Sequence, residues 1–190
     1  MGSGGRRRRA DAERSIAAIL DAAVKVLNER PEASMAEIAR AAGLTRQTVY
    51  AHYSSREELL QAVIERETAG AVAALEAARL GEGPPEEALR RLLDVTWDAA
   101  LQLVRVPLPR VSAEEEYELH RPILEPVEKL IRRGQRAGAF DRRLKPAWLG
   151  AVFIMLSHTA AEELAAGRLS PAEARRAREQ SILRVFGVEP

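Results

Sequence analysis

The chain has 190 residues, of which 46% are hydrophobic, 30% charged and only 4% aromatic, so its composition favours a globular, all-helical protein. Cysteine is absent, which excludes disulfide frameworks, thiolate nucleophiles and cysteine-ligated metal or iron–sulfur centres. The formal net charge of +1 argues against a uniformly basic protein, although it leaves room for a local basic patch.

The N-terminal sequence contains four consecutive arginines, Arg6 to Arg9, with no apolar run behind them. We therefore expect no secretory signal. The longest strongly apolar stretch, Ala147 to Leu156, is shorter than the ~20 residues of a membrane-spanning helix, so a cytoplasmic protein without membrane contact is expected. Residues 1–10 are expected to form a flexible basic tail; the alternative is an arm that contacts DNA phosphates or lies in a minor groove.

The residues that follow predict a first and a second helix. Apolar side chains recur at helical spacing from Ile16 to Leu27, which places the first helix at about residues 11–29. Ser34 and Glu37 match a capping box, in which each side chain bonds the backbone N–H of the other residue. The second helix is therefore expected to begin after Ser34 and to end near residue 42.

A third helix follows after a tight turn. Gly43 suits the left-handed C-cap of the second helix, and Thr45 is a natural N-cap for the third. Two short helices joined in this way form a helix-turn-helix. The outward face of the third helix carries Arg, Gln, Thr and Tyr around Ala51, and no carboxylate occurs from Gly43 to Arg56. This composition favours a polyanion-binding surface.

The rest of the chain predicts a helical body. A linking helix over residues 56–80 begins at a second capping box and ends at a cluster of glycine and proline. Five more helices are expected, at about residues 86–105, 112–120, 122–137, 146–166 and 171–186. The expected fold is all-α with about nine helices: an N-terminal three-helix helix-turn-helix domain over residues 11–55, and a C-terminal helical ligand-binding and dimerisation domain over residues 56–190.

The helix predicted at 146–166 has no polar side over nearly three turns, from Trp148 to Leu156. A helix that is apolar all round is buried on all sides. A partner subunit is the simplest cover for one side, and a central helix inside a single monomer is the alternative. The predicted dimer-interface residues are Gly150, Ala151, Ile154, Ser157, Ala161, Ile182 and Val185.

Residues 34–60 resemble the DNA-binding region of the TetR family of bacterial transcriptional regulators, above all in Gly-Leu-Thr-Arg-Gln-Thr-Val-Tyr-Ala-His-Tyr followed by Arg-Glu-Glu-Leu-Leu. The resemblance covers about residues 11–65. It implies that DNA is contacted by Ser34, Thr45, Arg46, Gln47, Thr48, Tyr50, His52 and Arg56. Their chemistry agrees, because Arg and Gln can pair with base edges and hydroxyl groups can donate to phosphates. Alternatives remain at Thr45, as a cap alone, and at His52, as a packed residue at the helix end.

The resemblance also implies a homodimer that binds a pseudo-palindromic operator in double-stranded DNA and is released by an unknown small-molecule effector. The alternative is a DNA-binding dimer that is controlled by a protein partner or has no small-molecule effector. Catalytic residues, cofactors and metal sites are not expected, because the chain lacks a glycine-rich phosphate loop and its three histidines are scattered. Candidate ligand-binding residues in the body are Trp97, Leu101, Val104, Glu118, His120, Trp148, Phe153, Met155 and His158.

Overall fold

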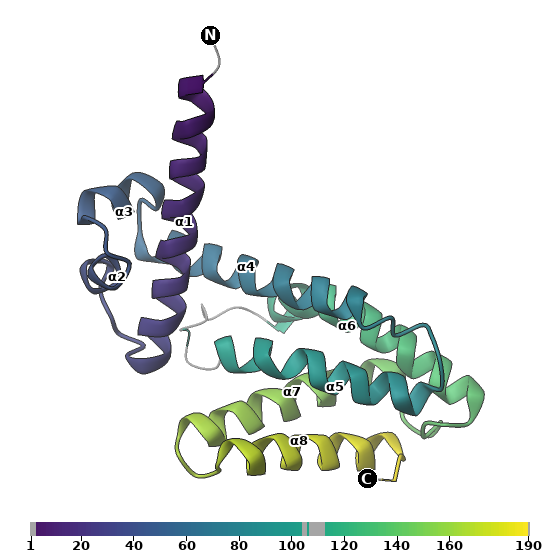
Figure 1. The fold of residues 1–190 in the computed structure, drawn as a ribbon. Coiled ribbons are helices and arrows are strands. Elements are labelled where there is room, and N and C mark those ends of the chain that lie inside the picture. Colours follow the sequence, from purple (N-terminus) through teal and green to yellow (C-terminus); the bar gives the residue numbers. More distant parts are fainter. Residues whose placement is uncertain (1–2, 104–105, 107–112, 190) are drawn as a thin grey trace. The chain divides into compact units, whose positions relative to one another are not determined.

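The computed structural model describes residues 3–103, 106 and 113–189. Within these residues the chain forms eight helices and no strand, which confirms the all-α prediction (Figure 1). The chain divides into an N-terminal unit that runs to Arg66 and a C-terminal unit that begins at Glu67. The helices are α1 (Ser3–Glu29), α2 (Met35–Ala41), α3 (Arg46–His52), α4 (Arg56–Ala77), α5 (Pro85–Leu103), α6 (Ala113–Ala137), α7 (Pro146–Ala165) and α8 (Pro171–Phe186).

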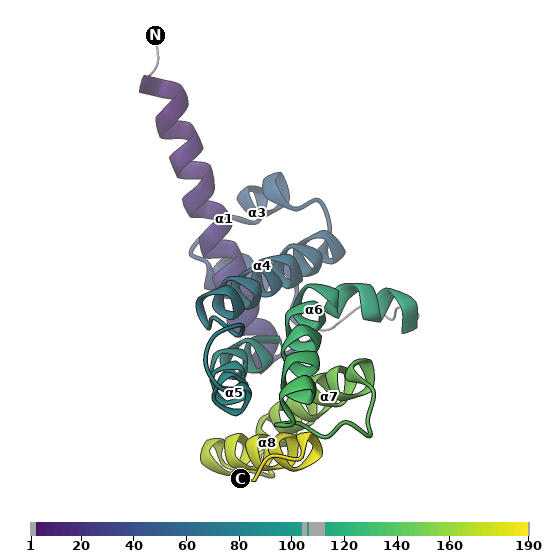
Figure 2. The ribbon, with the colours of Figure 1, turned by 90° about the vertical axis from the view of Figure 1, so that its right-hand side faces the viewer.

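The first helix begins earlier than predicted. α1 starts at Ser3, so residues 3–10 continue the helix instead of forming the expected flexible tail. Arginine and alanine are both strong helix formers, and Arg9 lies one turn before Glu13, with its Nε atom 3.8 Å from the carboxylate. The first turns of α1 project beyond α2 and α3 (Figures 1 and 2).

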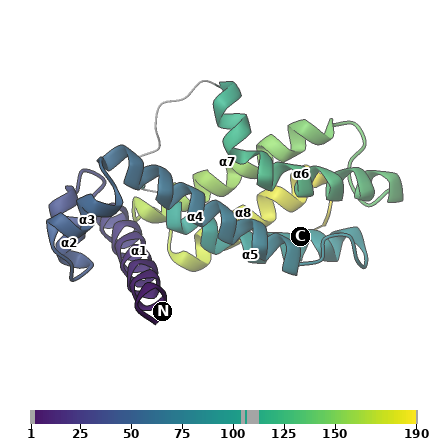
Figure 3. The same cartoon turned by 90° about the horizontal axis from the view of Figure 1, so that it is seen from above.

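The expected separation of two helices near residue 121 is wrong. Residues 113–137 form the single helix α6, with Pro122 and Pro126 inside it. Proline lacks an N–H and crowds the preceding turn, so it usually ends or bends a helix. Here it bends α6: Figures 2 and 3 show the first part of the helix turned away from the direction of the second. The described residues therefore contain eight helices where about nine were predicted.

The core of the C-terminal unit lies between α5, α6, α7 and α8. α7 and α8 pack side by side (Figure 1). Leu92, Ile131, Phe153 and Phe186 each come from a different one of these helices, and all four are completely or almost completely buried. Near the end of α6, a Cβ atom at Gly134 would overlap a buried aromatic ring, so this glycine permits close packing at the edge of the core.

Arg178 on α8 is a buried cation with neutral partners. Its side chain bonds both neighbouring helices: Nε donates to Ser157 Oγ at 2.9 Å, Nη1 to the Leu93 carbonyl oxygen at 2.7 Å and Nη2 to Thr96 Oγ1 at 2.5 Å. None of these acceptors is a carboxylate. Arg178 therefore joins α8 to α5 and α7 through hydrogen bonds that carry no compensating negative charge.

Two aromatic rings complete the surroundings of Arg178. The guanidinium carbon lies 5.7 Å from the ring centroid of Trp97 and 5.4 Å from that of Phe153, within the range of cation–π contacts. Burial lowers the pKa of Arg178 to about 10, because removal from water disfavours the charged form. The group nevertheless remains a cation at neutral pH.

Candidate nucleic-acid interface

The inner face of α3 packs against the other helices of the N-terminal unit. Val49 is completely buried, and so are Ile38 of α2 and Ile19 of α1. Gly43 in the turn between α2 and α3 has a φ of +69°, a left-handed conformation that glycine adopts without strain. α2 and α3 therefore form the helix-turn-helix predicted from the sequence, and α3 exposes the face opposite Val49.

The outer face of α3 carries the expected polar side chains. Arg46, Gln47, Tyr50 and Ala51 are exposed, and Thr48 is half-buried. The side chains of Arg46 and Gln47 make no hydrogen bond or ion pair with the residues that the structure describes. Their donors are therefore available to an external partner, and nothing acidic on α3 would repel phosphate.

Thr45 acts as the N-cap of α3. Its Oγ1 accepts a hydrogen bond from the backbone N–H of Thr48 at 3.1 Å and lies 2.8 Å from Thr48 Oγ1. The cap fixes the first turn of α3 beside Arg46, and Thr45 itself is exposed. Capping and phosphate contact are compatible at this residue.

Ser34 is engaged in the predicted capping box. The Glu37 carboxylate accepts from both the backbone N–H and the hydroxyl of Ser34, each at 2.9 Å, and it pairs with Arg30. The Ser34 hydrogen bonds, followed by the contact with Arg30, lower the pKa of Glu37 to about 2. The stability that this cap contributes is therefore fully present above pH 4.5 and is lost progressively as the pH falls toward 2. A phosphate contact by the Ser34 hydroxyl would replace its bond to Glu37.

Arg56 has an internal role that the sequence did not indicate. Its Nη2 donates to the carbonyl oxygen of Pro31 at 2.6 Å, and its Nε donates to that of Ala33 at 3.3 Å. These bonds tie the start of α4 to the loop between α1 and α2. His52, the last residue of α3, is half-buried beside the junction with α4.

Of the nine predicted ligand-binding residues, three are buried in the C-terminal unit or pack against its core. Trp97 and Phe153 are almost completely buried and flank Arg178, and Leu101 packs against the small cluster that contains Trp97. Val104 lies outside the described residues. Trp97, Phe153 and Leu101 act as core in the structure.

The other predicted ligand residues lie on α6 and α7, and the structure brings two of them together. Trp148 and Met155 are 59% and 57% exposed on α7. The rings of His120 and His158 approach each other, with centroids 5.3 Å apart, and Glu118 is an exposed, ion-paired residue of α6. No group of three or more metal-ligating side chains occurs in the described residues, and none of their helices is long and apolar enough to cross a membrane.

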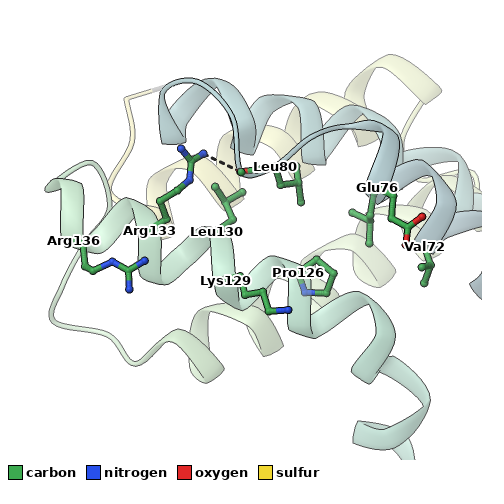
Figure 4. Close-up of a pocket in the computed structure, with 10 residues that line it drawn as sticks. Val72, Glu76, Leu80, Pro126, Lys129, Leu130, Arg133 and Arg136 are labelled. Carbon is green, nitrogen blue, oxygen red and sulfur yellow. Dashed lines mark hydrogen bonds between the residues drawn. The ribbon is translucent and has the colours of Figure 1, made fainter.

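The C-terminal unit contains a cavity of about 360 Å³ that involves none of the nine predicted residues (Figure 4). It lies between the C-terminal part of α4, the turn that follows and the second half of α6. Its charged lining residues are Glu76, Lys129, Arg133 and Arg136. A signal for it exists in the sequence, because residues 129, 133 and 136 recur at helical spacing and so share one face of α6.

The predicted dimer-interface residues fall into two groups. Gly150, Ser157, Ala161 and Ile182 are buried by the chain itself, so the small side chains of α7 serve close packing within one subunit. Ala151, Ile154 and Val185 keep exposed surface. Trp148, Ala151 and Met155 recur three and four residues apart and therefore share one exposed face of α7.

A helix-turn-helix with an exposed, carboxylate-free second helix defines a DNA-binding protein of the helix-turn-helix class. Residues 19–63 match the family model of bacterial regulatory proteins of the tetR family. The chain is 34% identical over 142 residues, 74% of either chain, to the HTH-type transcriptional repressor LfrR of Mycolicibacterium smegmatis. The chain belongs to the tetR family of bacterial regulatory proteins.

Solved structures agree with this assignment. The TetR-like regulator LfrR from Mycobacterium smegmatis, in complex with proflavine, is similar at a TM-score of 0.72 with 29% identity, over 91% of this chain and 96% of that chain. The fatty acid degradation regulator FadR from Bacillus halodurans shares the fold at a TM-score of 0.76 with 17% identity, over 91% and 95% of the two chains. The protein is a DNA-binding transcriptional regulator and not an enzyme.

Proposed function

We propose that the protein is a cytoplasmic repressor that binds a pseudo-palindromic operator as a homodimer and is released from it by a small molecule. The exposed face of α3 carries this proposal, because Arg46 and Gln47 present unpaired donors of the kind that bind guanine and adenine in a major groove. A single α3 contacts few base pairs, so two copies related by a two-fold axis would supply the remaining specificity.

The operator proposal predicts the symmetry of the DNA site. Selection of bound duplexes from a random library, followed by footprinting, should yield an inverted repeat with two half-sites about one helical turn apart. The physical reason is that a two-fold dimer presents two identical recognition helices. An enriched site without a repeat, or binding without sequence preference, would contradict the proposal.

The exposed face of α7 is the proposed dimer surface. The large apolar side chains of Trp148 and Met155 are exposed to water next to Ala151. Contact with a second copy of the chain would bury these side chains. We expect the protein to sediment as a dimer, and Met155→Glu should raise the dimer dissociation constant roughly tenfold or more by burying a charge. Met155→Leu and the exposed Ala172→Glu serve as controls and should leave it unchanged. A monomeric wild-type protein at micromolar concentration would refute the surface.

The effector proposal has two supports. LfrR has been observed in complex with proflavine, a small molecule, and the C-terminal unit of this chain contains a cavity of its own. A cavity favours a small-molecule effector over control by a protein partner alone. A thermal-shift screen on the purified protein, followed by fluorescence anisotropy of labelled operator, tests whether the molecules that bind also release DNA.

A further inference from the structure

The cavity between α4 and α6 has two chemically different sides. Lys129, Arg133 and Arg136 lie along one face of α6, as Figure 4 shows. The other lining residues are mostly apolar and include Val72, Leu75, Leu80, Pro126 and Leu130. A wall of this kind next to a row of cations suits a molecule that is itself part apolar and part negatively charged.

The cations are not neutralised by the protein. The side chains of Lys129 and Arg136 form no hydrogen bond or ion pair with any residue that the structure describes; the one contact at Arg136 is to its backbone carbonyl oxygen, which accepts from Arg142. Arg133 donates from Nη1 to the carbonyl oxygen of Gly83 at 2.6 Å and from Nη2 to that of Leu80 at 2.9 Å. Its Nε is buried and has no acceptor in the described part of the chain. A buried donor on a charged group is costly to leave unpaired, so an acceptor from outside the chain, either water or a bound anion, would stabilise it.

The negative charge in the lining is confined to one end. Glu76 lies beside Val72, and Arg136 lies at the opposite end of the cavity in Figure 4. An anionic group near Arg136 would therefore be far from Glu76 and close to α6. Arg136 thus marks one end of the cavity, and Leu80, Leu130 and the cationic side chain of Lys129 lie between the two ends in Figure 4.

We propose that this cavity binds an amphipathic anion, with a carboxylate or phosphate head on the face of α6 that carries Lys129 and Arg136, and an aliphatic tail against Leu80 and Leu130. Ammonium and guanidinium groups form charge-assisted hydrogen bonds with both kinds of head. The volume of about 360 Å³ lies within the range of about 300–1,000 Å³ that is typical of small-molecule sites. The regulatory consequence rests on the proposed function, and the binding step does not.

Calorimetric titration of the full chain with four ten-carbon probes, kept below micelle formation, tests the binding step. Decanoate and decyl phosphate supply the two anionic heads, decyltrimethylammonium supplies a cationic head, and decanol supplies a neutral one. We expect at least one of the two anionic probes to bind at least tenfold more tightly than the cationic and neutral probes. The preferred head then distinguishes a carboxylate from a phosphate ligand. Equal affinity for all four probes, or no binding of either anion, would overturn the proposal.

A pair of double variants tests the residues. Lys129→Gln with Arg136→Gln removes two exposed charges from the cavity and should weaken binding of the preferred anion tenfold or more. Lys145→Gln with Arg176→Gln removes the same two residue types from exposed positions that do not line the cavity, and it should leave the affinity unchanged. Circular dichroism checks that both variants are folded. Unchanged affinity in the first pair would place the anion elsewhere and overturn the assignment.

DNA binding is measured separately with the same probes. If the preferred anion binds in the cavity and the protein stays bound to the operator, the cavity is an anion site. The proposal that such anions release the protein from DNA is then wrong. If another small molecule releases the operator while neither anion binds, the proposed function stands and the assignment of the cavity fails. The two proposals can therefore be rejected independently.

Discussion

Arg46→Ala should weaken specific operator binding by about 1–3 kcal/mol, or roughly 5–150-fold. Arg46 is exposed on the first turn of α3 and has no partner among the described residues, so its removal leaves no protein group unsatisfied. The loss should therefore appear in DNA binding and not in the stability of the fold. Fluorescence anisotropy with the selected operator, at one fixed salt concentration, measures it.

Two comparisons separate base recognition from general attraction to phosphate. The affinity of Arg46→Ala for unrelated duplex DNA should fall much less than its affinity for the operator, because nonspecific binding depends on total charge. Arg176→Ala, on the exposed surface of the C-terminal unit, should bind the operator like the wild type. If Arg46→Ala retains wild-type operator affinity, Arg46 has no role in recognition.

Arg178→Ala should lower the free energy of unfolding by about 2–4 kcal/mol. The truncation leaves a void next to the rings of Trp97 and Phe153 and removes the hydrogen bonds that join α8 to α5 and α7. Urea denaturation followed by circular dichroism measures the change. A difference of less than about 0.5 kcal/mol from the wild type would show that the buried guanidinium is dispensable.

Arg178→Met provides the matched control, because it fills most of the same volume without charge. Thr96 Oγ1 donates to the Leu92 carbonyl oxygen at 2.7 Å, and Ser157 Oγ donates to that of Phe153 at 2.8 Å. Both hydroxyl groups therefore keep a partner when the guanidinium is lost. We expect Arg178→Met to be clearly more stable than Arg178→Ala. Equal losses in the two variants would assign the effect to the hydrogen bonds and not to the void.

The helix-turn-helix could be predicted from the sequence because its signals are local. The pairing of Ser34 with Glu37, the glycine at residue 43 and the cap at Thr45 each act within four residues, and the structure contains all three. α6 was harder to predict, since proline ends some helices and only bends others. The choice depends on the packing of the apolar face beyond it, which is a tertiary property.

The residues of α7 show a different obstacle. Its apolar side chains surround the helix, so periodicity could not tell which side faces the core of its own subunit. Gly150 was predicted for the dimer interface, yet a Cβ atom there would lie 3.3 Å from Leu124 on α6. The cavity was not predicted for a related reason. The cations on α6 line a cavity only because the end of α4 packs opposite them, and this packing is a tertiary property.

The bonds of Arg56 have a mechanical consequence for the N-terminal unit. Arg56 holds the loop between α1 and α2 through the carbonyls of Pro31 and Ala33, and Arg66, about 15 Å further along α4, pairs with Asp21 of α1 at 2.8 Å. Two points of attachment resist both sliding and rotation of α4 against α1. The first turns of α4 and the helices they hold should therefore move as one body, so that a force on α4 changes the position of α3 and leaves its shape intact.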